Sequence, residues 1–275
     1  MATGLGACVP AQGCGLDGAV LPWLKARKMR KYMGKQDELA VVAAGGALRM
    51  AGVAGEALAS PRIGVYLCVG YIPFERADIE LLTQGSTRDG AFSMELFSTV
   101  GIEQVNPLLT FRCLPNMPIF HVSLNFGLRG PYFVTYPGIG QLYLALERAV
   151  RALDAGEIDQ ALVTGVADQD NFLVDYHFGR LPEPRAARRD AAAALFLETR
   201  SHAEARGAQP RAQLDALEIG YRPHDPFGPP PVGAADDALG PASLGCALHA
   251  ATAGELSHAA STRDGIAARS RWSLQ

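Results

Sequence analysis

The chain lacks the residues that would mark it as a disulfide scaffold, a metal protein or a dinucleotide-binding enzyme. Its five cysteines are scattered, with no pair at a metal-ligand spacing, and we interpret them as small buried hydrophobic residues. Its six histidines include no i, i+4 pair on one expected helix. Gly138-Ile139-Gly140 lacks the third glycine and the following acidic residue of a dinucleotide fingerprint. The sequence therefore predicts no disulfide framework, no metal and no cofactor.

An excess of charge and a long apolar run are also missing. The net charge is −3, so no footprint for nucleic acid is evident. Residues 1–18 lack the basic start and continuous apolar stretch of a signal peptide. The most apolar window, residues 39–59, is interrupted by Arg49 and Glu56, which favours a buried helix over a membrane span. We therefore expect a cytoplasmic protein with no nucleic-acid or membrane partner.

Strands and helices alternate along the sequence, which indicates an α/β layered fold. With 48% hydrophobic residues, 275 residues can form one large domain or two closely packed halves. Strands are expected at residues 1–9, 62–70, 158–166, 192–198 and 213–221, and helices at 28–52, about 142–153 and about 241–253. Residues 223–240 are rich in Pro and Gly, and a hairpin is expected over 258–272 with its turn at 263–265.

Residues 130–168 have the form of a catalytic strand-turn-helix unit. A β-branched and aromatic strand over 132–136 leads into the sharp turn Pro137-Gly138-Ile139-Gly140, and a helix with apolar residues at helical spacing follows. Gly156 ends that helix before the next strand. Such a turn presents a nucleophile at a helix N-terminus, but this one contains no nucleophile.

These residues carry a resemblance to a known family. Gly130-Pro131, the turn at 137–140, the following helix and residues 156–165 resemble the β-ketoacyl synthases, which are condensing enzymes of the thiolase fold. Further matches lie at 114–116, 126–131, 193–198 and 205–208, so the resemblance covers roughly residues 1–220. It implies a thiolase-like αβαβα fold with a complete first half, residues 1–200, and an abbreviated second half, residues 201–275, packed as one domain.

The resemblance also implies that the condensing machinery is lost. In the family the turn carries a cysteine that accepts the acyl chain, and eight residues on from Pro131 this chain has Ile139. The family's two histidines should lie in the second half, and the nearest match puts Pro241 at one of these positions. Decarboxylating relatives carry Gln in place of the cysteine, whereas Gln141 lies two residues later and points elsewhere, which disfavours decarboxylation.

We therefore expect a non-catalytic subunit similar to a chain length factor, with no activity alone. The resemblance implies a heterodimer with an active β-ketoacyl synthase in a type II polyketide or fatty-acid-like pathway; the polyene class is suggested by analogy. The strand before the turn is expected at the subunit interface, and bulky apolar side chains near it are candidates for closing the partner's acyl channel. The interface residues are Tyr132, Phe133, Val134, Thr135 and Tyr136, and the channel candidates are Phe111, Met117, Phe120 and Phe133.

Two other functions stay open at this point. The chain could be a homodimeric scaffold that binds an acyl carrier protein, or an acyl transferase or hydrolase that uses Ser123, Cys113 or Cys68 as its nucleophile. A basic run could dock an acidic carrier protein, although a solvated helix face is the default interpretation. That run comprises Lys25, Arg27, Lys28, Arg30, Lys31 and Lys35.

Overall fold

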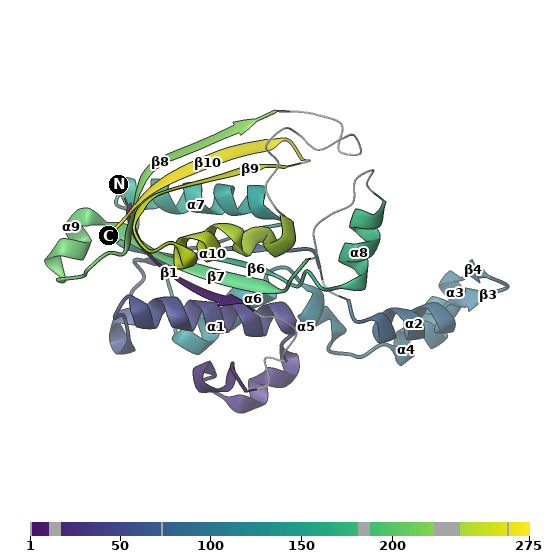
Figure 1. Cartoon of the computed structure of the whole chain (residues 1–275). Helices are drawn as coiled ribbons and strands as arrows, with labels where there is room; N and C mark the ends of the chain where they lie inside the picture. Colours follow the sequence, from purple (N-terminus) through teal and green to yellow (C-terminus); the bar gives the residue numbers. More distant parts are fainter. Residues whose placement is uncertain (1, 11–17, 73, 181–187, 223–236, 263) are drawn as a thin grey trace.

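The centre of the molecule is an eight-stranded sheet with the order β5-β2-β6-β7-β1-β8-β10-β9 (Figure 1). The structure, a computed structural model, describes residues 2–10, 18–72, 74–180, 188–222, 237–262 and 264–275. The strands are β1 Ala2–Pro10, β2 Ile63–Val69, β5 Tyr132–Thr135, β6 Gln160–Ala167, β7 Ala191–Thr199, β8 Ala212–Tyr221, β9 Gly254–Ser261 and β10 Ile266–Leu274. β2 pairs in parallel with β5 and β6, and the remaining neighbours are antiparallel.

Helices cover both faces of the strands that lie between β5 and β1. Every residue of β2 and β6 is buried, which explains why β2 reads in the sequence as a continuous apolar run. α1 (Lys35–Met50) and α6 (Met117–Phe126) pack on one face, and α7 (Ile139–Asp154) and α10 (Ser243–Ala250) pack on the other. The strands and helices predicted from periodicity are thus present, with their ends shifted by a few residues.

The sheet changes direction at the joint between β1 and β8. Only two residue pairs connect these strands, Thr3 with Gln213 and Gly4 with Ala212. Beyond the joint, β8, β10 and β9 lie over α7 and α10, on the side away from β6 and β7 (Figure 1). The layers therefore run α, β, α, β.

The outer face of β8, β10 and β9 is open in the part of the chain that the structure describes. Ser270 and Trp272 of β10 are buried against the helices, whereas Arg269 and Arg271 are exposed on the other face. The predicted layered α/β fold is confirmed, with no fifth, helical layer among the described residues.

Two helix starts differ from the prediction. α1 begins at Lys35 rather than at residue 28, because Gly34 is extended and its amide donates a 2.7 Å hydrogen bond to the Asp37 carboxylate. The preceding residues form a 3-10 helix, η2 (Arg27–Tyr32). α10 begins at Ser243 and ends at Ala250, after the 3-10 segment η5 (Asp237–Ala242), which contains Pro241. Residues 223–236 of the Pro- and Gly-rich stretch lie outside the described residues.

A group of short elements, residues 76–104, projects from the body as an arm (Figure 1). It contains α2 Arg76–Gly85, β3 Thr87–Arg88, β4 Ala91–Phe92, α3 Met94–Leu96, the π-helical η4 Phe97–Gly101 and α4 Ile102–Gln104. The other short elements are η1 Leu21–Trp23, η3 Gly55–Ala59, α5 Leu109–Cys113, α8 Phe172–Gly179 and α9 Arg200–Ala205. Among the described helices, none has the length and apolar character needed to cross a membrane.

Candidate functional site

The turn between β5 and α7 has the shape of a nucleophile elbow with an inert side chain. Gly138 adopts a φ of +88°, which glycine reaches without strain, and Ile139 is the first residue of α7. The Ile139 side chain is 1% exposed and lies in the same buried cluster as Leu142 and Leu244. The helix N-terminus would favour a thiolate here, but a buried isoleucine can form no covalent bond to an acyl group.

Neither cysteine proposed as an alternative nucleophile is activated. Cys68 lies under the turn, where its thiol donates a 3.2 Å hydrogen bond to the Gly138 carbonyl, and burial raises its pKa to about 12. Burial raises the pKa of the Cys113 thiol to about 11. Ser123, the third alternative, has no histidine hydrogen-bonded to its hydroxyl in the described part of the chain. These environments do not favour chemistry at any of the three positions.

Pro241 lies against the end of β6. A Cβ atom placed on Gly165 would be 2.1 Å from the Pro241 carbonyl oxygen, so Gly165 is needed for this close approach. Pro241 is buried and its ring can donate no hydrogen bond to a thioester carbonyl. The position offers none of the polarising groups that condensation requires.

β5 is one of the two edge strands of the eight-stranded sheet among the described strands, and β9 is the other. The Val65 amide donates a 2.8 Å hydrogen bond to the Pro131 carbonyl, and Val65 is paired with Tyr132. In a parallel pair, the backbone groups of alternate residues point to the neighbouring strand, so this bond determines which β5 amides point to β2. The amides of Phe133 and Thr135 point to β2, and those of Tyr132 and Val134 point away from it. A partner strand would therefore bond to the amides of Tyr132 and Val134.

The side chains at this edge are largely uncovered. Tyr132 is 72% exposed, and Phe133 and Tyr136 are each 39% exposed. Thr135 is buried and its hydroxyl donates to the Gln141 carbonyl at 2.8 Å. Of the five residues predicted at an interface, Thr135 thus supports the turn from inside.

Three of the four channel candidates lie at the surface. Phe111 of α5, Phe120 of α6 and Phe133 of β5 are exposed by 44%, 45% and 39%, whereas Met117 is buried. Leu114, just after α5, and Leu124 of α6 are exposed as well. Large apolar side chains are also uncovered on the arm, namely Leu81, Phe92, Met94, Val100 and Ile102. These apolar surfaces are what a protein partner would cover.

Comparison with known proteins assigns the fold and the family. Residues 22–171, more than half of the chain, match the model of the β-ketoacyl synthase N-terminal domain. The chain belongs to the β-ketoacyl synthase family. No curated protein matches it.

Several solved structures share the ketosynthase fold. A type II PKS acyl-carrier protein in complex with its ketosynthase (AntDE:AntF) matches with a TM-score of 0.70 and 14% identity, over 90% of this chain and 86% of that chain. The ishigamide ketosynthase/chain length factor matches with a TM-score of 0.67 and 16% identity, over 98% and 92% of the two chains. A β-ketoacyl synthase from Burkholderia phymatum STM815 matches with a TM-score of 0.66 and 17% identity, over 91% and 85%. At these identities the likeness shows the ketosynthase fold alone.

The basic run of this ketosynthase-family chain divides into paired and exposed cations. Arg30 pairs with Glu38 at 2.8 Å, and Lys35 bridges Asp168 and Asp190 at 2.9 Å to each. Burial lowers the pKa of Lys35, but the two carboxylates outweigh burial and hold it above its usual value. The other four, Lys25, Arg27, Lys28 and Lys31, are exposed.

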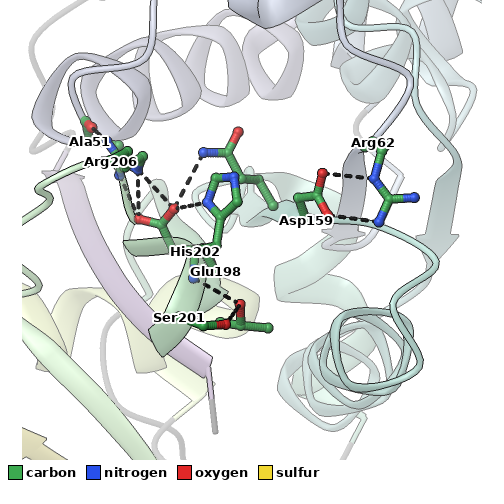
Figure 2. A network of polar contacts seen from close by, with 9 residues as sticks. Ala51, Arg62, Asp159, Glu198, Ser201, His202 and Arg206 are labelled. Carbon is green, nitrogen blue, oxygen red and sulfur yellow. Dashed lines mark hydrogen bonds and ion pairs between the residues drawn. The ribbon is translucent and has the colours of Figure 1, made fainter. Parts of the chain in front are cut away.

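A second polar network lies at the end of the central strands opposite to Lys35, and its role is structural (Figure 2). Glu198 at the end of β7 is buried, accepts a 2.8 Å bond from His202 and pairs with Arg206, which also reaches the Ala51 carbonyl. Beside it, Arg62 and Asp159 form a bidentate pair with both distances at 2.7 Å. The described residues hold no cluster of three or more potential metal ligands.

One cluster of polar side chains could not be recognised from the sequence. Ser243 of α10, His258 of β9 and Tyr143 of α7 meet where the third layer, α7 and α10, packs against the fourth layer. The spacing of the histidines in the sequence indicates no pairing between them. Tyr143 and His258 lie 115 positions apart, so no local pattern predicts their contact. Only the stacking of β9 over α7 and α10 brings them together.

Proposed function

We propose that this chain is a ketosynthase-like subunit without condensing activity, similar to a chain length factor, which forms a heterodimer with an active β-ketoacyl synthase. The observation that carries the proposal is Ile139. A residue that can form no thioester is packed, 1% exposed, at the helix N-terminus where the family places its acyl-accepting cysteine. In the proposal, residues 1–200 supply a complete ketosynthase half and residues 201–275 an abbreviated one.

The open edge of β5 supports the need for a partner. An exposed aromatic edge strand is an aggregation hazard unless another strand pairs with it. Tyr132, Phe133, Val134 and Tyr136 are the residues through which the partner would bind, with the Tyr132 and Val134 amides as donors. The exposed apolar residues of α5, α6 and the arm would extend the contact.

The same surface could shape the partner's acyl channel. Phe111, Phe120 and Phe133 are bulky and apolar, and they are exposed where a core residue would be covered. In a heterodimer they could reach into the neighbouring chain and close the far end of its channel. Met117 is buried in this chain and is the weakest of the four candidates.

An acyl carrier protein is the second partner of the proposal. The exposed cations Lys25, Arg27, Lys28 and Lys31 offer an electrostatic docking surface for an acidic protein. Arg30 and Lys35 are engaged with carboxylates within the chain and contribute less. The proposed pathway is a cytoplasmic type II polyketide or fatty-acid-like one, and the solved relatives described as a type II PKS complex and a ketosynthase/chain length factor support its type II polyketide form.

The test is a condensation assay with three preparations. The ketosynthase encoded nearest to this gene is assayed alone, this chain is assayed alone, and the two are co-expressed and assayed together, each with malonyl-loaded carrier protein. The proposal predicts no condensation by this chain and a gain for the pair over the ketosynthase alone. Equal activity of the ketosynthase with and without this chain would overturn the proposal and favour the homodimeric scaffold.

A further inference from the structure

Tyr143 is the hub of a buried hydrogen-bond network between α7 and the hairpin of β9 and β10. Its hydroxyl lies 2.9 Å from His258 Nδ1, 2.8 Å from the His258 carbonyl oxygen and 3.0 Å from Ser270 Oγ. Ser270 Oγ in turn accepts a 2.9 Å hydrogen bond from the Trp272 indole. On its far side, His258 Nε2 lies 3.4 Å from Ser243 Oγ.

The direction of each hydrogen bond follows from which groups can donate. A carbonyl oxygen only accepts, so the single hydroxyl proton of Tyr143 points to the His258 carbonyl. His258 Nδ1 and Ser270 Oγ must then be the donors in their contacts with the Tyr143 oxygen. In this arrangement all three contacts of the Tyr143 oxygen are hydrogen bonds, and the proton of a neutral His258 lies on Nδ1.

His258 Nε2 is consequently an unprotonated acceptor that faces Ser243 Oγ. Burial lowers the pKa of His258, which favours the neutral ring. Tyr143 holds the imidazole in the tautomer that can accept a proton from a hydroxyl, as an orienting group does for the base of a hydrolase. A serine-to-base distance of 3.4 Å is long, as is common before substrate binds.

Ser243 lies at a position that suits a nucleophile. It is the first residue of α10, directly after the 3-10 segment η5, and the dipole of the helix N-terminus favours negative charge that develops beside its Oγ. Both Ser243 and His258 are partly exposed, so the pair is not sealed in the core. The hydrogen bonds of this network do not connect Ser243 or His258 to the turn at Ile139.

We infer that Ser243 and His258 form a nucleophile–base pair that hydrolyses acyl thioesters. Ser243 Oγ attacks the thioester carbonyl as its proton passes to His258 Nε2; the C–O bond forms, the C–S bond breaks, and the thiolate takes the proton from Nε2. Water then attacks the serine ester with His258 again as base, which releases the carboxylic acid and regenerates Ser243. This activity is separate from the proposed role beside a ketosynthase and requires no partner chain.

The test uses the full chain alone and two probes. A fluorophosphonate measures nucleophilicity, since Oγ–P formation expels fluoride, and the adduct is located by peptide mass mapping. Octanoyl-N-acetylcysteamine measures turnover through release of its thiol. We expect one adduct at Ser243 and slow hydrolysis, both abolished by Ser243→Ala and lowered about 100-fold or more by His258→Gln.

The matched control is Ser257→Ala, because Ser257 is an exposed neighbour of His258 on β9 and its loss should leave both rates unchanged. Each variant is checked for folding by thermal unfolding. Should His258→Gln unfold, Ser243→Ala, which removes only one partly exposed hydroxyl, decides alone. A folded wild-type chain that takes no fluorophosphonate, or a Ser243→Ala variant labelled at the wild-type rate, would overturn the inference. Neither result bears on heterodimer formation.

Discussion

The thiol of Cys68 donates a hydrogen bond to the carbonyl of Gly138, the residue immediately before Ile139. Cys68, which lies beneath the elbow, thus stabilises the turn. Because burial raises its pKa to about 12, almost none of it is thiolate at neutral pH. Cys68 therefore does not replace the nucleophile that is missing at Ile139.

Alkylation measures this directly. In the folded chain at pH 8, iodoacetamide should leave Cys68 unmodified, because the thiol is both buried and protonated. Peptide mapping after exposure in concentrated urea should show full modification and serves as the control. Modification of Cys68 in the folded chain at the rate of a free thiol would contradict the assigned environment.

Ile139→Cys should not restore condensation. The new thiol lies at a helix N-terminus, but Pro241 supplies no imidazole to bind the malonyl carbonyl, and groups that act as a unit do not contribute additively. Loss of the buried isoleucine should cost about 1–3 kcal/mol of stability, against about 0.5–1.5 kcal/mol for the control Ile139→Val. Product formation by the folded Ile139→Cys chain alone, followed by mass spectrometry, would show that condensing groups had been overlooked.

The first half of the fold could be predicted because its signals are local. The apolar run of β2, the Pro-Gly-Ile-Gly turn and the spacing of apolar residues in α7 each determine one element. The start of α1 could not be placed, because it depends on a hydrogen bond from the Gly34 amide to the Asp37 carboxylate. The inert elbow at Ile139 was predicted for the same local reason as the turn itself.

The four residues considered for closing the acyl channel should differ in their effect on stability according to how buried they are. Phe111→Ala, Phe120→Ala and Phe133→Ala remove exposed side chains and should cost no more than about 1 kcal/mol each. If these side chains close the partner's channel, the heterodimer should make longer products without them. Met117→Ala, the buried control, should cost about 2–5 kcal/mol without lengthening products. Unchanged product length in all three Phe variants, measured in a reconstituted system, would remove the gating role.

Glu198 should make stability depend on pH. Burial raises its pKa, but hydrogen bonds from Arg206, His202 and Gln160 outweigh burial and hold it below the usual 4.5. Its contribution is therefore fully present above pH 4.5 and is lost as pH falls through the folded-state pKa. Glu198→Gln should lose about 1.5–3 kcal/mol at pH 7, and the difference from wild type should shrink in acid.

Urea unfolding of both chains at pH 7 and below pH 4 measures that difference. Glu218→Gln is the matched control, since Glu218 pairs with Arg269 at the surface and its loss should have little effect at either pH. A Glu198→Gln deficit that stays constant across the pH range would show that the carboxylate's charge is not what stabilises this end of the strands.

The rest of the site could not be predicted because its partners come from distant elements. Ser243 and His258 meet only because β9 lies over α10, and Tyr143 reaches them from α7. The direction of the β5 amides likewise required the register with β2, which no single-strand pattern contains. Exposure of Phe111 and Phe120 depends on where α5 and α6 lie in the fold, which the sequence pattern does not contain.

The measurement that tests the account most directly is the mass, by light scattering, of this chain co-expressed with the neighbouring ketosynthase, as wild type and as Val134→Pro. The Val134 amide faces away from β2, so proline there should remove a donor to the partner without breaking the sheet, whereas Phe133→Pro should also break the ladder to β2. We predict a one-to-one heterodimer for wild type and separate, folded chains for Val134→Pro. A homodimer or monomer of the wild-type chain in the presence of the ketosynthase would contradict the account.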